Sequence, residues 1–141
     1  MWLFTFPKKF QYRPRHQECD TVKGMDIWKH GTYVDTWSIV HFLSGFLLAG
    51  LSLKLGLGIV TALLISIVLL VSWEAFEWLL KIIEPSMNVM MDIIIGIAGF
   101  FTGAYLMMNY QGLEWVFYVA LVATVGLSLW GFLDFKKRGY R

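Results

Sequence analysis

The chain has 141 residues, of which 57% are hydrophobic and 16% charged, and its mean hydropathy is +0.60. This composition is more apolar than a soluble domain of that size needs to fill its core, so we expect an integral membrane protein. The net charge is only +2, which argues against a nucleic-acid-binding surface and favours contact with the lipid bilayer and its anionic headgroups. The single cysteine, Cys19, leaves no internal disulfide.

The predicted elements are an N-terminal segment, four membrane-spanning helices and a short tail. Residues 1–34 are polar and aromatic, and we expect a cytoplasmic or interfacial segment there. Each of the next four apolar stretches is long enough to cross a bilayer core of about 30 Å. They cover residues 35–53, 57–82, 88–110 and 113–135. Turn-forming residues separate them, and a basic cytoplasmic tail, residues 136–141, follows. The prediction is an all-α, integral membrane four-helix bundle.

The distribution of lysine and arginine predicts the orientation of this bundle. Six basic residues precede the first helix and four follow the last, and Lys81 lies at the break after the second helix. Only Lys54 lies at the opposite ends of the helices. Because cytoplasmic loops carry the excess of basic residues, we expect a multi-pass protein of the inner (plasma) membrane with both termini in the cytoplasm.

Ionisable residues occur inside three of the four predicted helices. A carboxylate near the bilayer interior costs about 2.5–3.5 kcal/mol on insertion scales, so such residues need a partner or a function. His41 follows the start of the first helix, Glu77 precedes the end of the second, and Asp92 follows the start of the third. Antiparallel packing places them at a similar depth, with Glu74 one turn deeper than Glu77. We therefore predict that His41, Glu77 and Asp92 surround a common point.

Small residues recur on the same helical faces as these ionisable residues. Such stripes let helix backbones approach closely and mark the buried faces of a membrane bundle. The first stripe contains Ser38, His41, Gly45, Ala49 and Ser52, and the other contains Asn88, Asp92, Gly96, Gly99 and Gly103. We interpret Asp35, Ser38 and Asn88 as helix N-caps or interfacial residues, not as ligands.

The order HFLSGF, WEAFEW and NVMMDIIIGIAGF resembles the VanZ-like group of small bacterial membrane proteins, and resembles still more a related uncharacterised family of four-helix membrane proteins. The resemblance covers about residues 37–104. It implies a four-helix membrane fold and a shared polar set of His41, Glu74, Glu77, Asn88 and Asp92. VanZ-like proteins are linked with resistance to the glycopeptide teicoplanin, and the second family has no assigned activity.

The residue types in this polar set suit three kinds of chemistry. Imidazole nitrogen and carboxylate oxygens can hold a divalent metal ion, with His41, Glu77 and Asp92 as ligands and Glu74 or Glu77 as a catalytic general base. Alternatively, the stacked carboxylates and His41 could share and transfer a proton. A third possibility is that His41 is the axial ligand of a haem or pigment.

Two classes of function remain open from the sequence. The first is an intramembrane enzyme or binding protein whose polar site acts on a lipid or a lipid-linked molecule near the cytoplasmic leaflet. The second is a non-catalytic accessory subunit of a larger membrane complex. In that case the N-terminal segment and the fourth helix would contact membrane-protein partners.

Overall fold

The computed structural model describes residues 33–79, 85–110, 112 and 114–139. Its four helices are α1 (Thr36–Lys54), α2 (Ile59–Leu79), α3 (Ser86–Asn109) and α4 (Glu114–Gly139). All four are long and apolar enough to cross a membrane. The predicted all-α, four-helix membrane bundle is therefore confirmed. Cys19, Lys81 and residues 1–32 of the N-terminal segment lie outside the described residues.

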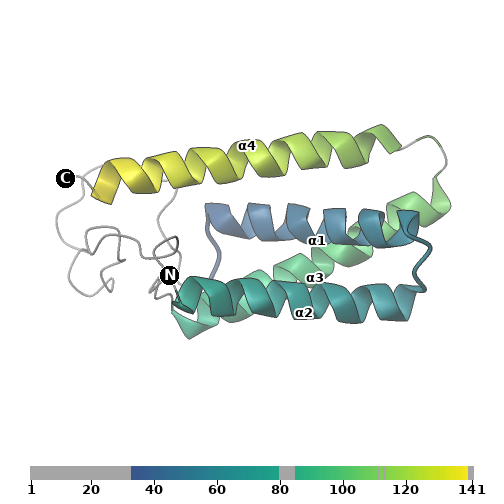
Figure 1. Cartoon of the computed structure of the whole chain (residues 1–141), viewed down its shortest axis with the longest axis horizontal. Helices are drawn as coiled ribbons and strands as arrows, with labels where there is room; N and C mark the ends of the chain where they lie inside the picture. Colours follow the sequence, from purple (N-terminus) through teal and green to yellow (C-terminus); the bar gives the residue numbers. More distant parts are fainter. Residues whose placement is uncertain (1–32, 80–84, 111, 113, 140–141) are drawn as a thin grey trace, which may run out of the picture.

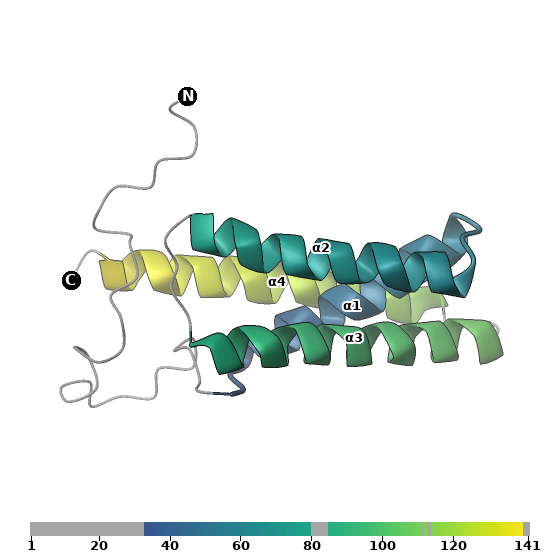
Figure 2. The same cartoon turned by 90° about the horizontal axis from the view of Figure 1, so that it is seen from below.

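The four helices run side by side along the long axis of the molecule, with α1 in the middle (Figure 1). α1 contacts each of the other three helices, and α2 also contacts α3. Seen after a quarter turn, α1 runs obliquely behind α2 and α3, with α4 on its far side (Figure 2). The starts of α1 and α3 and the end of α2 consequently meet at the same end of the bundle.

The contact between α1 and α3 is the most extensive in the bundle, and glycine makes it possible. A Cβ added to Gly45 would overlap the backbone carbonyl of Gly96, and a Cβ added to Gly99 would overlap the carbonyl of Phe42. The two backbones therefore touch directly. Every member of the two predicted small-residue stripes is buried. This is expected, because the hydrophobic effect does not drive helices together in a bilayer and close packing of small residues does.

The helix ends differ from the predicted limits by a few residues, for local reasons. Asp35 caps α1, because its carboxylate accepts the backbone N–H groups of Trp37 and Ser38 at 2.8 and 3.3 Å. α3 begins at Ser86, two residues early, directly after Pro85, whose missing N–H costs nothing at a helix start. α4 continues to Gly139 and so includes part of the predicted tail.

Candidate metal site

Three ligand-type side chains from three helices converge at the end of the bundle where α1 and α3 begin. Nε2 of His41 lies 3.6 Å from Oε1 of Glu74 and 3.9 Å from Oδ2 of Asp92. One ligand atom from each residue lies within 4.8 Å of the other two. The residues are 7%, 9% and 1% exposed, respectively. We call His41, Glu74 and Asp92 the HED cluster.

The separations within the HED cluster are close to those of a metal site. With metal–ligand bonds of about 2.0–2.1 Å, tetrahedral ligand atoms lie about 3.3 Å apart. The two separations from Nε2 of His41, 3.6 and 3.9 Å, exceed that value by a few tenths of an ångström, and all three ligand atoms lie within 4.8 Å of one another. The three side chains would move closer together to hold one ion. Nitrogen and oxygen ligands of this kind suit zinc, manganese or iron.

Asp92 is held in place by two hydrogen bonds from buried side chains. The hydroxyl of Ser38 donates to Oδ1 at 2.6 Å, and Nδ2 of Asn88 donates to Oδ2 at 2.9 Å. Both carboxylate oxygens thus have a donor from the protein, and each keeps a further lone pair for an ion. Hydrogen bonds of this type orient metal ligands and are a recurring part of metal sites.

Asn88 contributes one further observation. Its side chain is fully buried, and no hydrogen-bond donor among the described residues reaches Oδ1. A buried amide oxygen without a donor is costly, because it has lost its hydration without replacement. Amide oxygens are good ligands for hard cations, and the amide group that carries this oxygen lies against Asp92, to which its Nδ2 donates.

The helix α2 member of the cluster is Glu74, whereas the sequence prediction placed Glu77 there. His41 is the sixth residue of α1, Asp92 is the seventh of α3, and Glu74 is the sixth from the end of α2. Glu77 instead accepts a 2.9 Å hydrogen bond from the indole of Trp73, an exposed side chain. Glu74 and Glu77 are one helical turn apart on α2, and the packing of α2 against α1 and α3 brings Glu74 to the depth of His41 and Asp92.

Ser38 and Asn88 were predicted to be helix caps or interfacial residues, and their contacts with Asp92 were missed. Ser38 does belong to the capping box of α1, because its hydroxyl accepts the backbone N–H of Asp35 at 3.2 Å. The same hydroxyl also donates to Asp92. For Asn88 the sequence contained a usable signal, since it precedes Asp92 by four residues and shares its helical face.

Comparison of the chain with protein-family models, with curated proteins and with solved structures yields no match.

Proposed function

We propose that this membrane protein binds a divalent metal ion at the HED cluster and uses it to act on a lipid or a lipid-linked molecule. The observation that carries the proposal is the convergence of three buried ligand atoms from three helices within 4.8 Å. A divalent cation would also balance the charge of two carboxylates at a depth where ionised groups are costly. We also propose that the chain is related to VanZ-like proteins, because its HFLSGF, WEAFEW and NVMMDIIIGIAGF stretches resemble theirs.

The residues have distinct roles in this proposal. His41, Glu74 and Asp92 hold the ion, while Ser38 and Asn88 fix the orientation of the Asp92 carboxylate. A bound divalent ion supplies Lewis-acid chemistry, which polarises a phosphoryl or carbonyl oxygen and makes water nucleophilic near neutral pH. Glu77, one turn away on α2, is the carboxylate that would accept a proton from the attacking water.

A groove beside the cluster supports a lipid as the substrate. It has a volume of about 250 Å³ and is lined almost entirely by apolar surface, including that of Ile39, Phe42 and Ile95. Ser38 also lines it, and the hydroxyl of Ser38 contacts Asp92. An acyl chain that lies in this groove would bring its headgroup to the end of the bundle where the HED cluster lies.

The first test is elemental analysis of the detergent-purified protein, together with an absorption spectrum. We expect about one zinc, manganese or iron per chain in the wild type, and loss of that metal in Asp92→Asn, which keeps the size of the side chain but weakens it as a ligand. Asp134→Asn, on α4, is the matched control and should keep the metal. A metal-free wild type that also fails to take up added metal would contradict the proposal, and a visible haem spectrum would support His41 as an axial ligand instead.

The substrate class needs its own assay. Metal-loaded protein in vesicles would be incubated with phospholipids labelled in the headgroup or in an acyl chain, and released label would be measured. We expect Glu77→Gln to lower the rate by about 10²–10⁴-fold, the usual contribution of a general base, while the metal content is retained. Release that is equal in wild type, Glu77→Gln and Asp92→Asn would exclude hydrolysis at this site.

An accessory role is the second candidate, and the position of α4 supports it. α4 has the smallest buried share of the four membrane spans, 11% against 39% for α1. Much of its surface is therefore available to lipid or to a partner helix. Affinity purification from native membranes should recover a stoichiometric partner if this role holds, and deletion of residues 1–34 should release that partner. Recovery of the tagged chain alone would exclude it.

A further inference from the structure

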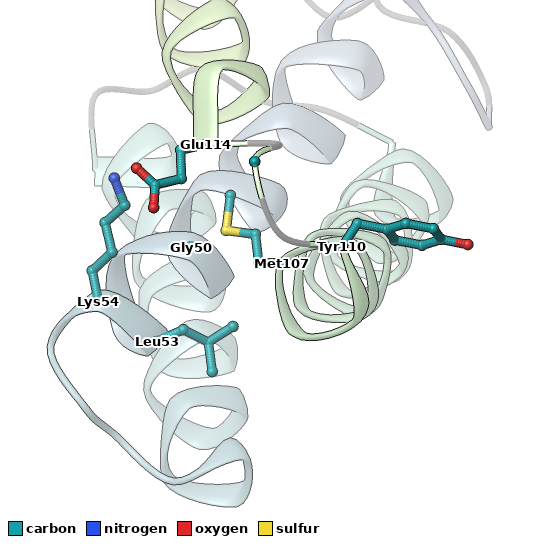
Figure 3. Close-up of a pocket in the computed structure, with 7 residues that line it drawn as sticks. Gly50, Leu53, Lys54, Met107, Tyr110 and Glu114 are labelled. Carbon is teal, nitrogen blue, oxygen red and sulfur yellow. The ribbon is translucent and has the colours of Figure 1, made fainter.

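A second cavity lies at the opposite end of the bundle from the HED cluster. It has a volume of about 440 Å³ and is bounded by the end of α1, the end of α3 and the start of α4. This volume lies within the range of about 300–1,000 Å³ that is typical of small-molecule sites. Figure 3 shows Leu53 and Met107 pointing into it, with Gly50 behind them. The apolar part of the cavity is thus built from α1 and α3.

Two oppositely charged side chains lie on one side of this cavity. Lys54 and Glu114 both line it, and Figure 3 labels both side chains. Among the ion pairs between described residues, none joins these two side chains. Among the described residues that line the cavity, Lys54 and Glu114 are the only charged ones. The cavity therefore offers one cationic group and one anionic group, with no net charge between them.

The position of Lys54 is fixed by aromatic residues of α4. Its Nζ lies 4.6 Å from the ring centre of Phe117 and 4.8 Å from that of Tyr118, and it is 3.5 Å from the Tyr118 hydroxyl. Cation–π contacts of this kind contribute about 0.5–1 kcal/mol at exposed sites. They hold the ammonium group beside the cavity and leave its positive charge without a counter-ion in the described part of the chain.

The position of Glu114 has a different cause. It is the first residue of α4 and the acidic residue in the first turn of that helix. A carboxylate is favoured there by the positive end of the helix dipole. Since α1 ends where α4 begins, the two charges lie at the end of their membrane spans, at the level of the lipid headgroups.

We propose that this cavity binds the headgroup of a zwitterionic aminophospholipid such as phosphatidylethanolamine. Lys54 would contact the phosphate, Glu114 would accept hydrogen bonds from the primary ammonium group, and Leu53 and Met107 would contact the start of an acyl chain. The neutral charge balance of the site matches the neutral charge of this headgroup. An anionic lipid would leave the Glu114 carboxylate opposed to a like charge, and a choline headgroup has no N–H to donate. This site is independent of the proposed metal chemistry.

Native mass spectrometry of the full chain, titrated with phosphatidylethanolamine, phosphatidylcholine and phosphatidylglycerol, tests the proposal. We expect the wild type to bind phosphatidylethanolamine about tenfold more tightly than either other lipid, the factor that one charge-assisted hydrogen bond provides. Glu114→Gln should remove this preference and favour phosphatidylglycerol, because the charge of Lys54 is then unbalanced. Lys54→Gln should weaken the binding of both phosphatidylethanolamine and phosphatidylglycerol. Asp134→Asn makes the same charge change as Glu114→Gln at the other end of α4, and should bind as the wild type does.

Three outcomes would overturn the proposal. The first is a wild type without preference among the three lipids. The second is an equal change of preference in Glu114→Gln and Asp134→Asn, which would indicate a general charge effect. The third is unaltered selectivity in Glu114→Gln. If Lys54→Gln does not fold, as judged by circular dichroism, the Glu114→Gln result decides the matter alone, because Glu114 is exposed at a helix start.

Discussion

The hydroxyl of Ser38 donates a 2.6 Å hydrogen bond to Oδ1 of Asp92, across the most extensive helix contact in the bundle. The same hydroxyl accepts the backbone N–H of Asp35 and so closes the first turn of α1. One buried serine therefore links the start of a membrane-spanning helix to the orientation of a candidate metal ligand.

Ser38→Ala should weaken metal binding without abolishing it. Loss of a hydrogen bond that orients a ligand typically lowers metal affinity by about 10–100-fold. Competition with a calibrated chelator measures this change. Ser66→Ala is the matched control, since Ser66 is equally buried and its hydroxyl has no hydrogen-bond partner among the described residues. Equal metal affinities in Ser38→Ala and Ser66→Ala would show that the bond to Asp92 does not support the site.

Glu74→Gln and Glu77→Gln should differ in metal content. Glu74 belongs to the HED cluster, so its amide variant should lose most of the bound metal. Glu77 accepts a hydrogen bond from Trp73, and its amide oxygen can still accept that bond, so Glu77→Gln should keep the metal. Elemental analysis of both variants beside the wild type measures the difference. Metal lost in Glu77→Gln and kept in Glu74→Gln would return Glu77 to the ligand set.

Gly45→Ala and Gly99→Ala should each destabilise the bundle by about 1–3 kcal/mol or more, the usual cost of overpacking. In both cases the new methyl group would overlap a backbone carbonyl of the opposite helix, which cannot rotate away. Gly126→Ala on α4 is the control, because open space surrounds its Cβ position and alanine is the better helix former. Thermal unfolding in detergent compares the three variants. A loss of stability in Gly126→Ala as large as in the other two would contradict close α1–α3 packing as the cause.

Labelling of single cysteines should show that the loop between α1 and α2 faces away from the cytoplasm. Gly58 has open space around its Cβ position, so Gly58→Cys in a Cys19→Ser background should be accessible. A membrane-impermeant maleimide added to intact cells should modify this cysteine, because the excess of basic residues keeps the opposite helix ends inside. A cysteine added after Arg141 should react only after lysis. The reverse pattern would invert the predicted orientation.

The sequence by itself determined the fold class, the number of membrane spans and the faces that pack. Hydrophobic stretches of 19–26 residues bounded by turn-forming residues leave the backbone few alternatives in a bilayer, where only internally hydrogen-bonded helices are stable. The small-residue stripes through Gly45 and Gly99 marked the buried faces, because helices in a bilayer approach closely where their facing residues are small.

Only the tertiary structure decided which side chains form the cluster. Glu74 and Glu77 lie three residues apart and share a helical face, so periodicity cannot choose between them. The choice depends on how far α2 is displaced along its axis relative to α1 and α3, and a displacement of one turn exchanges the two glutamates. One of the two hydrogen-bond partners of Asp92 was likewise decided by packing: Ser38 reaches it from another helix at 2.6 Å, a contact between residues 54 positions apart in the chain. Such contacts arise from the crossing of helices, which local sequence patterns do not encode.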